Sequence, residues 1–320
     1  MKISIVICTR NRAASLTQCL QSLLAMQWTG AYEREIVIVD NGSTDETRAT
    51  IEGFAAQLPS GLAEALRYVY EPRAGLSRAR NAGIRQSTGE VVAFTDDDVL
   101  VSPDWCNEMH REFAADQRLC MMGGRILLAR PTLQPVTYKT DERRRTFHSP
   151  HDFNEVYGAN TAFRRALFEQ VGGFDVRLGA GCFHASGEEA DLVYRGLSAG
   201  SHLLYAPNVV VHHDHGRTTL EQVLRLEYGY GKGLSGFTMK HILRGDRTAL
   251  RILWWSLEGW WRRWRGKPED SPDLQRRSRA HCHGILMGLL LAPFYFAFGD
   301  GDTRSLASAK TRSSSSPVLG

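Results

Sequence analysis

Four short apolar runs in the first hundred residues predict β-strands. They lie at residues 3–8, 35–40, 66–70 and 91–95. The fourth run is continuously apolar rather than alternating, which is typical of a strand covered on both faces. Stretches with helical periodicity lie between the runs, and strand–helix alternation at this spacing predicts an α/β fold with a parallel sheet.

Three of these predicted strands end in a polar residue: Thr9, Asp40 and Asp96. The carboxyl ends of parallel strands meet at one edge of a sheet, and ligands bind at that edge in open α/β folds. Three separate segments of the chain therefore converge on one candidate site.

The main candidate for chemistry is Asp96-Asp97-Asp98, which ends the fourth run. Adjacent carboxylates repel one another unless water or a cation compensates their charge. Mg²⁺ and Mn²⁺ prefer oxygen ligands and commonly share their coordination with substrate phosphates. The run therefore predicts a metal–diphosphate site, and a solvated acidic turn is the alternative.

The middle of the chain adds further predicted elements. Residues 120–128 and 203–211 predict strands, the second one interrupted at Pro207. Residues 129–155 show weak periodicity and predict a long, partly mobile insertion. A helix is expected to start near Arg165 and to end at the glycines that follow residue 171.

An acidic block at residues 187–191, Gly-Glu-Glu-Ala-Asp, opens another predicted helix. Acidic residues are favoured in a first helical turn, but three carboxylates exceed what capping requires. One of them can serve as a general base. Asp191 can instead pair with Arg195, one turn along the same helix.

The last third of the chain is aromatic and basic. Residues 217–267 hold eleven Lys and Arg against four Asp and Glu, and residues 249–264 include five tryptophans. Such a composition suits a membrane interface. Residues 285–298 are apolar but shorter than the ~20 residues that a spanning helix needs, so an interfacial, re-entrant or buried helix is expected. Packing as a small helical appendage is the alternative.

Composition and motifs exclude several other classes. The net charge of +4 gives no reason to expect nucleic acid, and the six cysteines form no Cys-x-x-Cys pair, which predicts reduced thiols in a cytosolic protein. Arg10 and Arg12 interrupt the first apolar region, so no signal peptide is expected. The glycine motifs of dinucleotide-binding and phosphate-loop folds are absent.

Six blocks of the sequence occur in a consistent order: SIVICTRNR, EIVIVDNGSTDET, GLSRARNAGI, VVAFTDDD, GANTAFRRALFEQVGGFD and GEEADLVYR. Together they resemble glycosyltransferase family 2 of the polysaccharide-biosynthesis type, inverting enzymes with the GT-A fold. The resemblance implies a mixed, mostly parallel nucleotide-binding sheet with helices on both faces. The expected parts are a catalytic domain (1–215), a helical extension that can associate with a membrane (216–299) and a disordered tail (300–320).

The resemblance also implies roles for individual residues. The implied nucleotide-sugar contacts are Thr9, Arg10, Arg12, Asp40, Arg80, Asn81, Asp96, Asp97 and Asn160. Asp98 is the implied metal ligand, with Asp96 on the metal or the ribose. His212 completes the metal site, or lies in a polar turn without a ligand. The implied base is Glu189, where the family usually has Asp, and Asp191 is the alternative.

The sequence thus predicts a glycosyltransferase that depends on Mn²⁺ or Mg²⁺. It would move a sugar from a nucleoside-diphosphate donor to a hydroxyl of a glycan or lipid-linked acceptor, without nucleic acid. Its expected location is the cytoplasmic face of the inner membrane, with peripheral contact through the C-terminal helices. A nucleotidyltransferase that makes an activated sugar, and an inactive glycan- or lipid-binding homologue, are the alternative functions.

Overall fold

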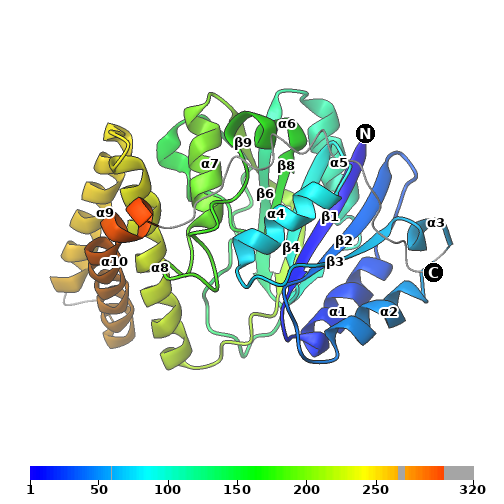
Figure 1. The fold of residues 1–320 in the computed structure, drawn as a ribbon, viewed down its shortest axis with the longest axis horizontal. Coiled ribbons are helices and arrows are strands. Elements are labelled where there is room, and N and C mark those ends of the chain that lie inside the picture. The colour runs from blue at the N-terminus through cyan, green and yellow to red at the C-terminus, as the bar shows by residue number, and fades with distance from the viewer. Residues whose placement is uncertain (59, 266–270, 299–320) are drawn as a thin grey trace.

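The computed structural model describes residues 1–58, 60–265 and 271–298. Its centre is one mixed sheet in the order β3-β2-β1-β4-β8-β6-β9-β5, with β7 beside β9 (Figure 1). The strands are β1 (Lys2–Thr9), β2 (Glu33–Asp40), β3 (Leu66–Tyr70), β4 (Val91–Asp96), β5 (Val99–Val101), β6 (Leu119–Leu128), β7 (Arg145–Phe147), β8 (Asn160–Arg164) and β9 (His202–His213). All four strands predicted in the first hundred residues are present.

Helices cover both faces of this sheet, as predicted. They are α1 (Ala13–Leu24), α2 (Thr47–Ala55), α3 (Ser60–Ala63), α4 (Leu76–Gln86), α5 (Trp105–Ala115), α6 (Arg165–Val171), α7 (Glu188–Ser198), α8 (Leu220–Ile242), α9 (Arg247–Arg265) and α10 (Pro272–Phe298), with a short 3-10 helix at Pro150–Asp152. Alternation along β1 separates the two cores: Ile5 packs with α1 and α5, and Val6 packs with α4 and α7.

The parallel strands β3, β2, β1 and β4 bring their carboxyl ends to one edge. In this register Thr9 pairs with Asp40, and Cys8 pairs with Asp96. The predicted convergence of the three polar strand ends is therefore confirmed.

The other half of the sheet differs in detail from the prediction. Strand β8 runs antiparallel to both β4 and β6. Strand β9 is a single strand that continues to His213, and the region around Pro207 is a register shift against β6 rather than a break. Residues 129–155 contain β7, so the expected insertion is not wholly irregular; β7 escapes periodicity analysis because it has only three residues.

The C-terminal helices α8, α9 and α10 stand together at the end of the molecule beyond α7 (Figure 1). Phe237 of α8 and Ile252 of α9 pack with Tyr194 of α7 in a third small core. No described helix is long and apolar enough to cross a membrane. The proposed tail, residues 300–320, lies outside the described residues.

Candidate active site

A pocket of about 360 Å³ opens where β1 and β4 end. Residues from the strand ends, from the start of α4, from the loop before α7 and from α8 line it. They are Cys8, Thr9, Arg10, Arg12, Asn41, Gly75, Leu76, Ala79, Asp96, Asp97, Asp98, Thr137, Ala180, Gly181, His213, Arg217 and Tyr230. The acidic run and the strand-end residue Thr9 thus meet in one cavity, as the sequence predicted.

Asp96, Asp98 and His213 form a potential metal site, because one ligand atom from each lies within 4.8 Å of the others. The sequence-based assignment named His212 instead. Successive side chains of a strand point to opposite faces, so on β9 only one of the two histidines can face the carboxylates. His213 pairs with Val99 on β5, directly after Asp98, and its side chain is the one in this group.

Asp98 is held by cations but is not fully satisfied. Its Oδ2 accepts a 2.8 Å hydrogen bond from Arg12, and its Oδ1 lies 3.2 Å from Nε2 of His213. That second approach lacks hydrogen-bond geometry, so Oδ1 is buried without a hydrogen-bond partner. Burial would raise the pKa of Asp98, but His213 and Arg12 outweigh it and lower the pKa.

His213 is oriented from its other side. Its Nδ1 lies 3.3 Å from the backbone oxygen of Thr137, while Nε2 faces Asp98. Burial would lower the pKa of His213, but Asp98 outweighs it and raises that pKa. With a metal bound, donation from Nδ1 to this carbonyl would leave a lone pair on Nε2 for the metal, as in metal-ligating histidines. Two carboxylates and an imidazole form a donor set that suits a divalent cation, so these residues fit the metal that the sequence predicted.

Asp97 is buried rather than solvent-facing. It accepts a 2.8 Å hydrogen bond from the hydroxyl of Thr9, and Arg12 approaches it at 3.1 Å. Burial raises the pKa of Asp97 to about 7 despite these partners. Asp97 therefore ties the loop after β1 to the end of β4, and it does not belong to the potential metal site.

Arg80 on α4 connects the two acidic regions. Its guanidinium is 2.7 Å from Glu188, 3.5 Å from Asp96 and 4.0 Å from Glu189. Burial alone would lower the pKa of this arginine, but the surrounding carboxylates raise it, so Arg80 stays charged. Gly158 makes this packing possible, because a Cβ there would lie 2.7 Å from a guanidinium nitrogen of Arg80.

Glu188 and Glu189 at the start of α7 have different environments. Glu188 is 3% exposed, and its burial together with the neighbouring Glu189 raises its pKa to about 8. The side chain of Glu189 is 26% exposed, and its Oε2 has no hydrogen-bond partner. Neither side chain lines the pocket, and Oε2 of each is buried without a hydrogen-bond partner. Glu189 is the more exposed carboxylate of the pair.

Four residues expected to bind the nucleotide sugar do not line the pocket: Arg80, whose contacts are given above, and three others. Asp40 accepts a 2.9 Å hydrogen bond from the hydroxyl of Tyr68. Asn81 makes two hydrogen bonds to the backbone of Phe174, of 2.8 and 2.9 Å. The amide of Asn160 donates to backbone carbonyls of β6 and β9, at 3.0 and 2.9 Å. In this structure, these side chains hold elements together around the site.

Asp191, the alternative base, is fully buried. Arg195 contacts it at 2.9 Å, as predicted for residues one turn apart. Lys240 and His241 of α8 complete its surroundings, at 2.7 and 2.8 Å. Asp191 does not line the pocket, because Arg195, Lys240 and His241 enclose its carboxylate.

Asn41, His213, Arg217 and Tyr230 are among the pocket residues that sequence reasoning missed. Asn41 directly follows the predicted carboxylate Asp40, so its position signalled the site. Arg217 and Tyr230 lie in the segment expected to form a separate extension, and no local motif marks them. Arg217 has no carboxylate partner within the described part of the chain.

Comparisons with known proteins agree with this geometry. Residues 4–172 match the family described as "Glycosyl transferase family 2". The chain is 27% identical to a "Glucosyl-dolichyl phosphate glucuronosyltransferase" of Haloferax volcanii, over 67% of this chain and 69% of that protein. It is 26% identical to "Succinoglycan biosynthesis protein ExoM" of Rhizobium meliloti, over 79% of each.

A solved structure shares the fold: the mannosyltransferase PcManGT of Pyrobaculum calidifontis, described in complex with GDP-Man and Mn²⁺. It superposes with a TM-score of 0.55 at 19% identity, over 95% of this chain and 77% of that one. The matched family covers more than half of the chain, including the acidic run. The chain therefore belongs to glycosyl transferase family 2 and is a glycosyltransferase.

Proposed function

We propose that this enzyme is a metal-dependent inverting glycosyltransferase that uses a nucleoside-diphosphate sugar. The observation that carries the proposal is the group of Asp96, Asp98 and His213 in the pocket, with Oδ1 of Asp98 buried and without a hydrogen-bond partner. These three residues would hold Mn²⁺ or Mg²⁺. When bound, the cation would supply charge neutralisation for the departing diphosphate.

The proposed donor position follows from the charges around the pocket. Arg10, Arg12 and Arg217 place three guanidinium groups along it. Guanidinium groups bind phosphate through paired N–H donors. Arg12 is already engaged with the acidic run, which leaves Arg10 and Arg217 for the donor phosphates. The loop at Thr9 and Asn41 would then adjoin the base and the ribose.

Glu189 is the proposed base. An inverting transfer needs a group that takes the proton of the acceptor hydroxyl as its oxygen attacks the anomeric carbon. Glu189 is partly exposed, and its Oε2 has no hydrogen-bond partner. Glu188 is bound to Arg80, and Asp191 to Arg195, Lys240 and His241, so neither is as free to accept that proton.

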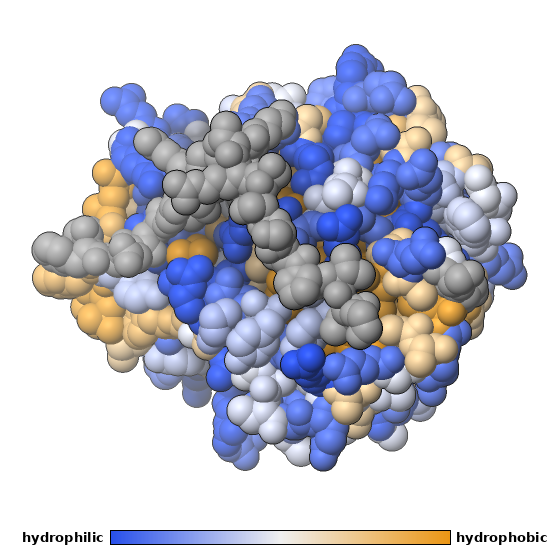
Figure 2. Space-filling model, turned by 45° about the vertical axis from the view of Figure 1, so that its right-hand side comes forward, coloured by the Kyte–Doolittle hydropathy of each residue, from blue (hydrophilic) through white to orange (hydrophobic). Residues whose placement is uncertain are grey.

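The proposed acceptor is a hydroxyl of a glycan or lipid-linked glycan, which suits an enzyme at the cytoplasmic face of the inner membrane. One helix face supports membrane contact. On α10, Leu286, Leu290 and Phe294 recur every four residues and are 52%, 68% and 67% exposed. The exposed Arg276 and Arg279 precede them on the same face. Figure 2 shows hydrophobic residues along its left-hand edge, the end of the molecule formed by the C-terminal helices.

An anionic lipid surface is the proposed occupant, because it matches both the apolar stripe and the arginines. Sedimentation with phosphatidylglycerol vesicles should retain the wild-type chain, and Leu290→Asp should release it. Trp28→Ser, a change at an exposed aromatic residue (51%) outside the C-terminal helices, is the control and should bind normally. Equal retention of the Leu290 variant would contradict membrane contact through this face, and a concentration-dependent dimer would indicate a second copy as the occupant.

A transfer assay tests the proposed reaction. Purified enzyme is given nucleotide sugars and a glycan acceptor, with and without Mn²⁺, and release of nucleoside diphosphate is measured together with the anomeric configuration of the product. Metal-dependent release with inversion is expected. Pyrophosphate formed from a sugar phosphate and a nucleoside triphosphate would instead indicate a nucleotidyltransferase.

A further inference from the structure

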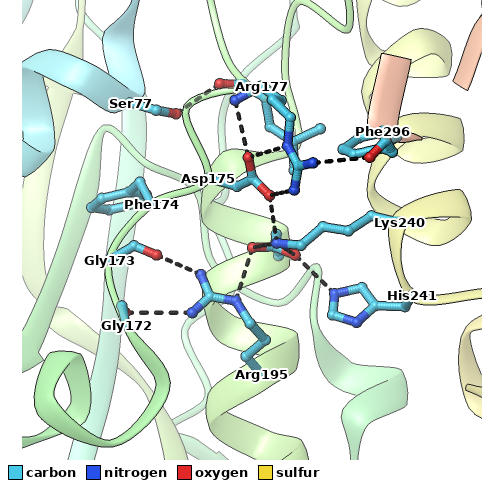
Figure 3. A network of polar contacts seen from close by, with 12 residues as sticks. Ser77, Gly172, Gly173, Phe174, Asp175, Arg177, Arg195, Lys240, His241 and Phe296 are labelled. Carbon is cyan, nitrogen blue, oxygen red and sulfur yellow. Dashed lines mark hydrogen bonds and ion pairs between the residues drawn. The ribbon is translucent and has the colours of Figure 1, made fainter. Parts of the chain in front are cut away.

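A second charged cluster lies away from the pocket, between α7 and α8 (Figure 3). Its members are each at most 8% exposed: Asp175, Arg177, Asp191, Lys240 and His241. Burying charged groups is costly unless they are closely paired. None of these side chains lines the pocket or has a role in the reaction proposed above.

Contacts in the cluster converge on Asp191. Nζ of Lys240 donates to both of its carboxylate oxygens at 2.7 and 2.8 Å, and Nε2 of His241 lies 2.8 Å from Oδ1. Nε of Arg195 donates to Oδ2 at 2.9 Å. Burial alone would raise the pKa of Asp191, but Arg195, Lys240 and His241 hold that pKa well below its usual value.

The cluster also holds the loop that precedes α7. Lys240 lies 2.9 Å from Asp175, which Arg177 contacts through two further hydrogen bonds of 3.0 and 2.8 Å. Arg195 donates to backbone carbonyls at residues 171–173 (Figure 3). One lysine of α8 thus connects the loop and the helix.

This arrangement bears on the reaction because Asp191 lies in the first turn of α7, which also carries Glu188 and Glu189. Arg80 on α4 holds this turn through Glu188. Lys240 holds it from α8 through Asp191. The first turn is therefore fixed between two cations that come from different parts of the fold.

We propose that Lys240 and His241 are positioning residues for the transfer reaction: they fix the first turn of α7, and with it the carboxylate of Glu189, relative to the donor pocket. This inference rests on the proposed role of Glu189 as base. It makes the C-terminal helices part of the catalytic unit, because the last turn of α8 sets the geometry of a group on α7. Misplacing a catalytic group by about 1 Å can cost ~10²-fold in rate.

The chain offers a matched control for a merely structural role. A separate ion pair joins α8 to α10, where Arg277 donates to Glu227 at 2.8 and 3.1 Å. It does not include α7. Lys240→Met removes a cation from Asp191, and Arg277→Met removes a cation from Glu227. Only the first change releases α7, the helix that carries Glu189.

Two readouts separate the variants. In steady-state kinetics, Lys240→Met should lower kcat at least about tenfold, with donor affinity within about twofold of wild type, whereas Arg277→Met should keep the wild-type kcat. In amide hydrogen exchange, which needs no activity, residues 188–191 should exchange faster in the Lys240 variant than in the Arg277 variant.

His241→Phe keeps an aromatic ring beside Tyr194 and Phe237 and removes one donor to Asp191, so it serves if the Lys240 variant does not fold. It should lower kcat less than Lys240→Met and leave donor affinity unchanged. A wild-type kcat in both folded variants would overturn the positioning role while leaving the proposed function intact. A wild-type enzyme without any transfer activity would overturn the proposed function, and this inference with it.

Discussion

The two buried acidic clusters of this enzyme differ in how completely their carboxylates are paired. Asp191 receives hydrogen bonds from three side chains and has no exposed surface. Asp98 has one well-formed partner, Arg12, and an oxygen without any hydrogen bond. Proteins rarely leave buried polar atoms unsatisfied, so a native exception points to a ligand. In these two clusters, incomplete pairing beside an open pocket, rather than acidity, separates the proposed binding site from the structural cluster.

Their positions in the fold explain the difference. Asp98 lies beyond the end of a parallel strand, where the sheet opens towards solvent. Asp191 lies where two helices pack, so its charge must be compensated from within the protein. Substitutions in the two clusters should therefore have different consequences.

Asp98→Asn should have the largest effect on activity. Removing a carboxylate ligand weakens the electrostatic stabilisation of the leaving group, and we expect transfer to fall about 10³-fold. Mn²⁺ titration of donor binding is the measurement. Asp97→Asn is the control, since Asp97 does not belong to the potential metal site, and it should keep metal dependence. If both variants lose Mn²⁺-dependent donor binding equally, the claim that Asp98 but not Asp97 is a metal ligand is wrong.

Glu189→Gln should keep donor affinity and lose about 10²-fold in kcat, because an amide cannot take the proton of the acceptor. Donor binding by calorimetry and turnover by diphosphate release measure the two quantities. If this variant turns over at the wild-type rate, Glu189 is not the base.

His213→Ala should weaken Mn²⁺ binding at least about tenfold, since it removes a proposed ligand. His212→Ala is the matched control on the same strand and should leave Mn²⁺ affinity unchanged. The reverse result would restore the sequence-based assignment and contradict the strand alternation described here.

Asp191→Asn should lower stability, and it should also lower kcat as Lys240→Met does, because Lys240 holds the first turn of α7 through this carboxylate. Breaking a fully buried ion cluster by removing one partner costs about 3–5 kcal/mol, which thermal unfolding would detect. Mn²⁺ affinity should stay at its wild-type value, in contrast to Asp98→Asn. If Asp191→Asn weakens Mn²⁺ binding and leaves stability unchanged, the cluster around Asp191 is not a purely structural one.

The smallest expected effect is a pH dependence that arises from Glu188. Its pKa is raised to about 8 by burial and by Glu189, from an ordinary value of 4.5. A raised pKa means that the folded state binds the proton more tightly, so this contribution to stability is lost as the pH rises towards 8. Thermal unfolding of the metal-free chain should show a decline between pH 5 and 8 that Glu188→Gln reduces. An unchanged slope in that variant would contradict the raised pKa.

Local sequence patterns predicted much of the fold and the centre of the site. Continuous apolar runs identified the parallel strands, and the polar residues at their ends identified the edge where the pocket lies. The pattern could not choose between His212 and His213, because that choice depends on the register of β9 against β5.

Long-range packing explains why other residues were placed wrongly, or missed, from the sequence. Asn81 and Asn160 lie in recognisable blocks, but their amides bond to backbone groups brought close only by folding. Arg217 and Tyr230 reach the pocket because α8 packs against α7 and the loop before it, a contact that no local pattern encodes. The domain boundary at residue 215 stays a prediction. The contacts of α8 with α7 and with the pocket cross this boundary, so α8 contributes to the same site as the residues before it.

Anomalous scattering of Mn²⁺ in a crystal soaked with a nucleoside diphosphate would locate the metal. We expect a peak among Asp96, Asp98 and His213, in contact with the diphosphate. A well-occupied diphosphate without a peak there, or with the metal bound elsewhere, would contradict this expectation.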